Sequence, residues 1–483
     1  MREDAFAVWP FHLHALIRST LRGADDNTDD RWSEQDWQHA AARAHTTLGE
    51  QWSSSTVGGR LLLVAALRQG LALARDHRLD LDWLTEAAWA YVGDWLWEPV
   101  APPAPQTAGT GAGAGELQTP ADALIETLSA LARRQHEHRE RTVQRLTAVL
   151  DSALLPEDLT DLARYYQAKA QRDLGRSADS RRGMQQVAGR GGRLAPDARR
   201  GLAHLARLAG DFPTALATAQ TLGREGSQQR VLGDLWWPQG DIERAAIAYE
   251  AARTDAEQQG IAGERATAQA QRAFVLAFAD PGRADDELDL AEQLLTGLDL
   301  RATTLTTKIA ALIRDAGTDQ DIEDRASALR AESAAAGIAS ARATLELAVA
   351  FHHAVRGADD DLAATVERLH ELTRGGDHAY YSDITPASWP GSPPPHPPPP
   401  SGSTVKMPPA PAGASWSPTG AHSCGPGRSP GTNCPGPGSH GGRGHLADGH
   451  ELRARDDVVR EQAAGDVDVA HRLAAAPVVV PSR

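Results

Sequence analysis

The chain of 483 residues contains two cysteines, Cys424 and Cys434, and both lie near its C-terminal end. The residues before Cys424 therefore supply no thiol for a disulfide, a nucleophile or a thiolate metal site. Long apolar runs are also missing, because the longest, Leu61 to Leu67, is far shorter than the roughly 20 residues that cross a bilayer. No signal-type apolar segment follows Met1. We therefore expect a protein of the reducing cytoplasm.

Patterns that carry catalysis or metal binding are absent as well. The sequence has no Gly-Lys-Ser/Thr phosphate loop, no nucleophile elbow and no kinase signature. The pairs His12/His14 and His136/His138 are two residues apart, which on a helix directs them to different faces, whereas helical metal pairs prefer a spacing of four. The two cysteines, ten residues apart, lack the short knuckles of zinc sites. We expect no enzymatic activity, no cofactor and no bound metal.

Charge and composition divide the sequence unevenly. The formal net charge of −15 disfavours non-specific attraction to nucleic acid or anionic membranes. Residues up to about 384 are rich in Ala, Leu, Asp, Glu and Arg, whereas the remainder is dominated by Pro, Gly, Ser and His. We predict an all-α protein with a Trp-rich helical bundle at 1–97, a flexible Pro/Gly/Ala linker at 98–118, a helical-hairpin solenoid at 119–384 and a disordered low-complexity tail at 385–483.

Apolar periodicity predicts helices in the bundle, and eight of the 12 tryptophans lie there. The expected helices are Phe6 to Leu21, Trp37 to Leu48, Leu61 to Leu73 and Trp83 to Trp97. Pro10 should kink or end the first of them. We interpret the tryptophans as aromatic packing between helices.

Glycines that separate two amphipathic helices recur along the second half of the folded region, at Gly175, Gly210, Gly240, Gly317 and Gly357. One gap in this series is nearly double, and the turn Asp280 to Arg283 falls within it. We therefore predict about six hairpins. A single hairpin cannot bury its own apolar stripe, so the hairpins must stack into an array.

The most regular unit is Leu232 to Ala252, in which small residues stand where two helices would touch. Its Leu-Gly pair, its Gly-Asp turn and its later Ala, Tyr and Ala occupy the signature positions of the tetratricopeptide repeat, at Gly233, Gly240, Asp241, Ala245, Tyr249 and Ala252. The segment Gly210-Asp211-Phe212 is a second good match. Residues 155 to 375 thus resemble the tetratricopeptide repeat family, although the connection Arg253 to Gly263 exceeds its usual spacing.

The sequence also resembles the C-terminal helical-repeat sensor arm of bacterial STAND-type signalling ATPases. The similar segment is Trp9 to Arg18, which follows the ATPase core in such proteins. No ATPase core precedes it here. The resemblance implies a stand-alone arm or fragment that acts in bacterial signalling without hydrolysing ATP.

In tetratricopeptide arrays the first helix of each hairpin lines a concave groove, and this resemblance implies a set of groove residues. Counting from the turn glycines places there Lys169, Arg172, Arg200, His204, Arg207, Arg230, Asp234 and Trp237. Arginine forks bind carboxylates bidentately, so this mainly basic face predicts a protein partner that offers an acidic peptide or a free C-terminus. The alternative is that these arginines pair with neighbouring Asp and Glu side chains.

A second functional hypothesis is a transcriptional regulator module, with an effector in the array and DNA contacted by the N-terminal helices. The acidic balance and the lack of a basic recognition helix weigh against it. In the last hundred residues, Pro386 to Pro400 has polyproline character. This segment either recruits proline-binding domains or results from a reading-frame shift, which sequencing of the locus near codon 385 would reveal.

Overall fold

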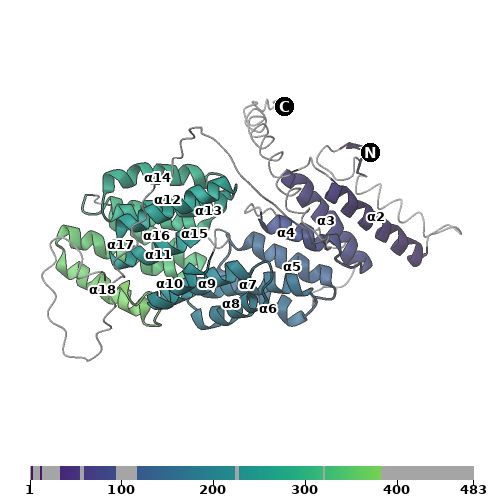
Figure 1. Cartoon of the computed structure of the whole chain (residues 1–483), viewed down its shortest axis with the longest axis horizontal. Helices are drawn as coiled ribbons and strands as arrows, with labels where there is room; N and C mark the ends of the chain where they lie inside the picture. The colour runs from purple at the N-terminus through teal and green to yellow at the C-terminus, as the bar shows by residue number, and fades with distance from the viewer. Residues whose placement is uncertain are drawn as a thin grey trace, which may run out of the picture. The chain divides into compact units, whose positions relative to one another are not determined.

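The computed structural model describes residues 2–3, 11–12, 33–54, 59–93, 117–222, 228–318, 321–381 and 384, and nearly all of them are helical (Figure 1). Most of the predicted linker and the predicted tail with its two cysteines lie outside these residues, so the domain boundaries stay predictions. None of the described helices is both long and apolar enough to cross a membrane.

The N-terminal segment contains two short strands. Strand β1 (Arg2–Glu3) pairs antiparallel with β2 (Phe11–His12), and Arg2 lies opposite His12. The predicted helix is therefore wrong at Phe11 and His12. Pro10 directly precedes β2, and because it has no N–H and a fixed φ it does not continue a helix. The remaining residues of the predicted helix lie outside the described part.

The next three predicted helices are confirmed where the structure describes them, as α2 (Glu34–Ser54), α3 (Gly59–His77) and α4 (Trp83–Gly93). Trp83 packs between them, and its indole Nε1 donates to the carbonyl of His45 over 3.0 Å. A Cβ at Gly70 would lie only 2.6 Å from its ring. The predicted packing role is therefore confirmed for Trp83.

Helices α5 (Pro120–Arg133) and α6 (Arg139–Ser152) form the first hairpin after the undescribed segment. A capping box begins α5: the amide of Asp122 donates to Thr119 Oγ1 over 3.1 Å and the amide of Thr119 donates back to Asp122 Oδ2 over 2.9 Å. Buried side chains of α3, α4 and α5 share one hydrophobic core with those of the helices that follow.

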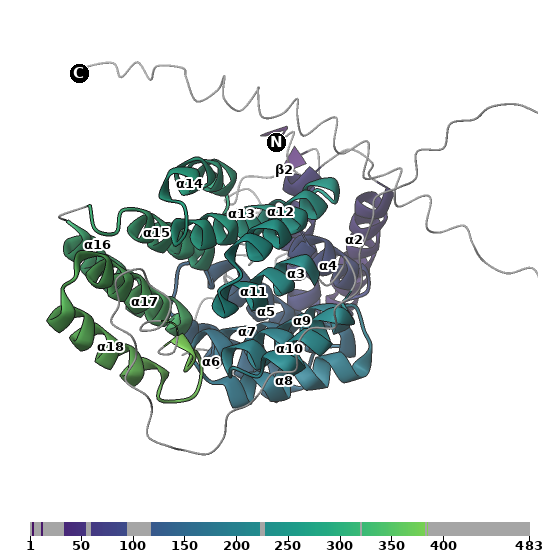
Figure 2. The same cartoon turned by 60° about the vertical axis from the view of Figure 1, so that its left-hand side comes forward.

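Six hairpins follow within the residues described from 157 to 373, and their helices are α7 (Glu157–Asp173) with α8 (Ser177–Arg190), α9 (Ala195–Leu208) with α10 (Phe212–Gln220), α11 (Gln228–Trp236) with α12 (Ile242–Gln258), α13 (Ala262–Ala277) with α14 (Pro281–Leu295), α15 (Arg301–Arg314) with α16 (Ile322–Ala336), and α17 (Ala339–Arg356) with α18 (Asp359–Thr373). Figure 2 shows α16, α17 and α18 side by side. The protein is thus a helical-hairpin solenoid of the tetratricopeptide type.

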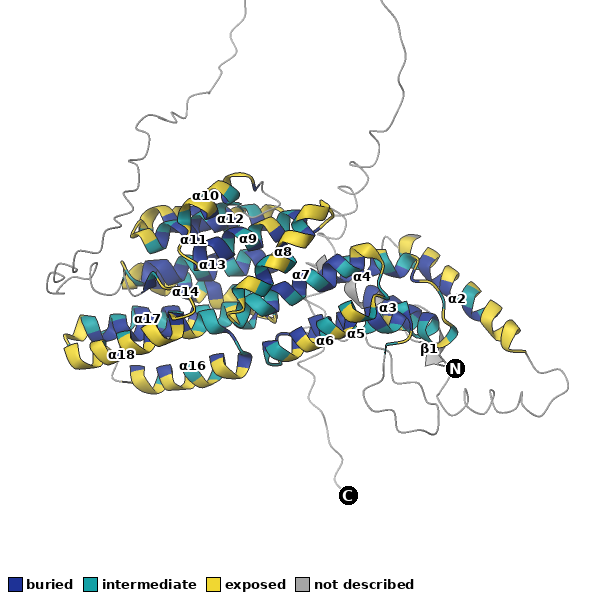
Figure 3. Ribbon diagram, turned by 90° about the horizontal axis from the view of Figure 1, so that it is seen from below, coloured by how far each residue is buried: buried dark blue, intermediate teal, exposed yellow. Residues whose placement is uncertain are grey.

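The predicted turns are confirmed by backbone conformation. The five turn glycines have φ between +68° and +84°, a left-handed region that disfavours other residues. The turn between α13 and α14 has none of these glycines. There Asp280 caps α14, and its side chain accepts from the amide of Arg283. Figure 3 shows the resulting pattern, in which outer helices such as α16 and α18 present an exposed face away from the buried one.

The connection expected at Arg253 to Gly263 is largely helical. Helix α12 continues through Gln258, and the turn to α13 is short. Within this extension Arg253 pairs with Glu250 at 2.6 Å and with Glu257 at 3.7 Å, at the spacings that stabilise a helix surface. The extra length of this connection is therefore mostly helix, because these side-chain pairs favour continuation of α12.

Segments far apart in the sequence meet around the concave side of the array. Gln135, in the turn between α5 and α6, accepts from the amide of Arg301 at the start of α15 over 3.2 Å. The amide of His378, after α18, donates to the carbonyl of Leu208 at the end of α9 over 2.7 Å. These two hydrogen bonds therefore join segments of the array that are distant in sequence.

Candidate functional site

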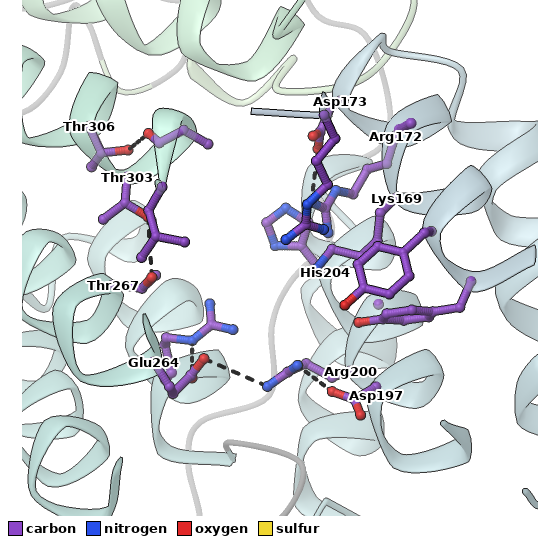
Figure 4. A pocket seen from close by; sticks show the side chains of 18 of the residues that line it. Lys169, Arg172, Asp173, Asp197, Arg200, His204, Glu264, Thr267, Thr303 and Thr306 are labelled. Atoms are coloured by element: carbon purple, nitrogen blue, oxygen red, sulfur yellow. Dashed lines mark hydrogen bonds and ion pairs between the residues drawn. The ribbon is translucent and has the colours of Figure 1, made fainter. Parts of the chain in front are cut away.

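A cavity of about 260 Å³ lies on the concave side of the array (Figure 4). The first helices of five successive hairpins, α7, α9, α11, α13 and α15, line it together with the turn between α5 and α6. Six of the eight predicted groove residues are in its wall, namely Lys169, Arg172, Arg200, His204, Arg230 and Asp234. The structure thus brings together residues from three hairpins that the turn glycines placed on one face.

The two sides of the cavity differ in chemistry. Figure 4 shows Lys169, Arg172 and His204 on the side formed by α7 and α9. The opposite side, formed by α13 and α15, carries three threonines. Their hydroxyls form local hydrogen bonds, including a 3.2 Å contact between Thr267 and Thr303. Cations on one wall therefore face hydroxyl groups on the other.

Positive charge exceeds negative charge around the cavity. Six cationic side chains line it, Arg134, Arg139, Lys169, Arg172, Arg200 and Arg230. The four carboxylates in the lining are Asp173, Asp197, Asp234 and Glu264. This local excess of positive charge stands against the net charge of −15 of the whole protein. An anionic ligand is therefore favoured in the cavity over a cationic one.

Most of the arginines form ion pairs within the wall, as the alternative interpretation of the sequence expected. Asp173 Oδ2 accepts from Arg139 over 3.0 Å, and its Oδ1 accepts from Arg172 over 2.9 Å. Although burial opposes ionisation, these two arginines hold the pKa of Asp173 at about 2. Glu264 accepts from Arg230, and Arg200 bonds with Asp197. These pairs fix the guanidinium groups in place around the cavity.

Lys169 differs from the arginines. Its Nζ lies 5.4 Å from the ring centroids of both Tyr165 and Tyr166. Among the residues that the structure describes, no carboxylate lies within ion-pair distance of this ammonium group. Burial lowers the pKa of Lys169 well below its usual value, and the charges of Arg134 and Arg172 act in the same direction. A bound anion would supply the missing countercharge.

His204 and Asp234 line the cavity but serve the wall itself. Burial and the charge of Arg207 lower the pKa of His204 to about 3, so its ring is neutral near pH 7. Asp234 Oδ1 accepts from the Tyr249 hydroxyl over 2.8 Å and from Gln271 Nε2 over 3.0 Å. Burial opposes ionisation of Asp234, but its bond with His204 and the nearby arginines hold its pKa at about 2. Asp234 therefore links α11 to α12 and α13.

Two of the predicted groove residues, Arg207 and Trp237, do not line the cavity. Arg207 is buried, and its Nη1 donates to the Tyr380 hydroxyl over 2.8 Å. Trp237 is buried in an aromatic cluster, with its ring centroid 5.3 Å from that of Phe274 and 5.8 Å from that of Tyr381. The reason is local, because Trp237 begins a 3-10 turn whose tighter winding directs it into the core.

Sequence reasoning missed other lining residues, above all Tyr165, Tyr166, Glu264, Thr267, Thr303 and Thr306. The glutamate and the threonines lie near the N-terminal ends of α13 and α15, farther from the turn than the counted positions. The α13 hairpin also lacks a turn glycine from which to count. In the sequence, Tyr165 and Tyr166 belong to an apolar stripe, which predicts packing and not a place in the cavity wall.

Comparisons with known proteins found a weak structural likeness. No protein-family model and no curated protein sequence matches the chain. Among solved structures, the protein is similar to the crystal structure of Rap protein complexed with competence and sporulation factor. The identity is 10% and the TM-score 0.45, over 70% of this chain and 94% of that chain. The hairpin contacts described above, and not this weak likeness, establish the architecture.

Proposed function

We propose that this protein is a non-enzymatic binding protein of bacterial signalling that holds an acidic peptide, or the C-terminus of a partner protein, in the cavity of its helical array. The observation that supports this most strongly is the Lys169 ammonium group, which lies in a recess with excess positive charge and without a carboxylate partner among the described residues. A ligand carboxylate at this position gains a charge-assisted bond and supplies a countercharge that favours the protonated form of Lys169, whose pKa burial lowers.

The neutral groups of the cavity suit a peptide backbone. Gln271 uses its Nε2 for Asp234, while its Oε1 is buried without a hydrogen-bond partner. Thr142 Oγ1 is likewise buried and unpartnered. Buried polar atoms of this kind are rare and costly unless something binds them. A peptide offers alternating N–H donors and C=O acceptors that satisfy both atoms.

The dimensions favour a short segment over a folded domain. A volume of about 260 Å³ lies near the lower end of the range for ligand pockets, roughly 300–1,000 Å³. A peptide of a few residues fits these limits.

A selection from random octapeptides displayed on phage tests the proposal. Immobilised wild-type protein should enrich peptides that contain Asp or Glu, and raising the salt concentration should elute them because exposed ligand charges are screened. Lys169→Met should lose this enrichment, whereas Lys308→Met, which alters an exposed lysine on α15, should keep it. Equal enrichment of acidic residues by both variants, or none by the wild type, would overturn the proposal.

A further inference from the structure

A second cavity, of about 320 Å³, lies against the first. Its walls carry a set of apolar side chains, Trp89, Val92, Leu194, Ala252, Ala256 and Ile261. They come from α4 in the N-terminal helices, from the residue before α9, from α12 and from the residue before α13. None of these six residues lines the first cavity.

The two cavities share part of their lining. The common residues are Tyr165, Tyr166, Lys169, Asp197, Arg200 and Glu264. The shared wall therefore contains the Lys169 ammonium group and the rings of the two tyrosines, whose centroids lie 5.2 Å apart. An extended peptide advances about 3.3–3.6 Å per residue, so one residue bound at this wall can direct its neighbours into either cavity.

From this arrangement we propose that the second cavity is an apolar subsite for the same ligand, and that it takes an aliphatic or aromatic residue near in sequence to the acidic residue held at Lys169. The inference rests on the proposed function and names its ligand class: a peptide in which an acidic residue stands within one or two positions of an apolar one. Burial of the apolar group against Ile261 and Leu194 stabilises the complex through the hydrophobic effect.

Trp89 gives this subsite a defined wall and rim. Its side chain is half-buried, and its indole Nε1 is buried without a hydrogen-bond partner. Towards the rim, the Arg193 guanidinium lies 5.4 Å from the Trp89 ring centroid and pairs with Glu86. Trp89 and Arg193 both line the cavity, so the aromatic ring borders it beside a guanidinium that is already paired with Glu86. Specificity for the apolar residue therefore depends on a helix that precedes the solenoid.

The same octapeptide selection tests this inference separately. The wild type should enrich Leu, Ile, Phe or Trp at a fixed spacing from the acidic residue. Ala256→Leu, which fills the second cavity, should remove the apolar preference and keep the acidic one. Thr254→Leu is the matched control, because Thr254 is exposed on the same helix, and it should behave as wild type. Circular dichroism and thermal unfolding confirm that each variant is folded.

Affinities of two synthetic peptides make the comparison quantitative. For the wild type, a peptide with Glu next to Leu should bind at least about tenfold more tightly than its Glu-Ser counterpart. Ala256→Leu should bring the ratio near one. Trp89→Ala removes one wall of the cavity instead of filling it, and it should also reduce the ratio of the two affinities. This variant replaces Ala256→Leu in the test if Ala256→Leu does not fold. Acidic enrichment without an apolar preference would overturn the second site alone, whereas loss of acidic enrichment would overturn the proposed function.

Discussion

Arg200 on α9 and Glu264 on α13 form an ion pair in the wall of the cavity, with Nη1 and Oε2 3.8 Å apart (Figure 4). Glu264 also accepts from Arg230 on α11, so one carboxylate partly neutralises two arginines from different hairpins. It occupies the kind of position that a ligand carboxylate would take. The wall therefore contains an internal competitor for an acidic peptide.

Removing this carboxylate should strengthen ligand binding. Glu264→Gln keeps the side-chain shape and leaves the charges of Arg200 and Arg230 available to the ligand. We expect the dissociation constant of an acidic octapeptide to fall about tenfold, measured by fluorescence anisotropy. Glu332→Gln, which removes an exposed partner of Lys308, should leave it unchanged. Unchanged or weaker binding by the Glu264 variant would show that this carboxylate does not compete with the ligand.

Asp234 should contribute more to stability than to binding. Asp234→Asn leaves the buried Arg207 short of a countercharge and disturbs the bonds to Tyr249 and Gln271. We expect the free energy of unfolding to drop by about 3 kcal/mol. Tyr249→Phe removes one hydrogen bond and should cost about 1–2 kcal/mol. Urea unfolding measures the free energy of unfolding of both variants. A larger loss of stability for Tyr249→Phe than for Asp234→Asn would contradict this prediction.

Two histidines, the half-buried His204 and the buried His378, should make the fold sensitive to mild acid. Burial and Arg207 lower the pKa of His204 to about 3, and burial holds the pKa of His378 well below its usual value. Both rings are neutral in the folded state and take up a proton on unfolding below about pH 6.5. Their contribution to stability is therefore complete above that pH and decreases as the pH falls.

The magnitude follows from linkage. Between about pH 7.5 and about pH 5.5 His204 should lower the free energy of unfolding by about 1.4 kcal/mol, and His378 should act in the same direction. The urea midpoint should shift accordingly. Replacing both His204 and His378 by Asn should flatten the profile over this range, whereas His370→Asn, at an exposed position, should keep it. A wild-type midpoint that does not change between the two pH values would disprove this account of the histidines.

The signature glycine of the most regular hairpin should not tolerate a methyl group. A Cβ at Gly233 would lie 2.6 Å from the Tyr249 ring, so Gly233→Ala should destabilise the fold by about 1–3 kcal/mol. Gly189 in α8 has no atom within 4 Å of such a Cβ, and Gly189→Ala should instead stabilise the helix by up to about 1 kcal/mol. Thermal unfolding of the two variants measures whether each one loses or gains stability. Equal effects of Gly233→Ala and Gly189→Ala would contradict the packing assigned to Gly233.

The repeat architecture could be predicted from the sequence because its turns depend on local residues. Glycines such as Gly210 and Gly240 adopt left-handed conformations at the turns, and Asp211 and Asp241 cap the helices that follow. The extension of α12 was missed because its ion pairs replace the turn residues that a loop would need.

The site could be predicted only in part, since counting from a turn gives the face of a helix but not its tertiary neighbours. Lys169 and Arg200 lie on the expected face and reach the cavity. Arg207 lies on the same face, yet Tyr380, distant in sequence, covers it. The ion pair of Glu264 with α9 and the hydrogen bond of His378 to Leu208 depend on tertiary contacts that no local pattern encodes.

The affinity of an acidic octapeptide for Lys169→Met, beside the wild type and Lys308→Met, tests the central claim most directly. Lys169 has no carboxylate partner among the described residues, so its replacement leaves no buried carboxylate unpaired and should not lower the free energy of unfolding. We predict that Lys169→Met binds at least about tenfold more weakly at about 50 mM salt, while Lys308→Met binds within about twofold of the wild type. Equal dissociation constants for all three proteins would contradict the assignment of this cavity as an acidic-peptide site.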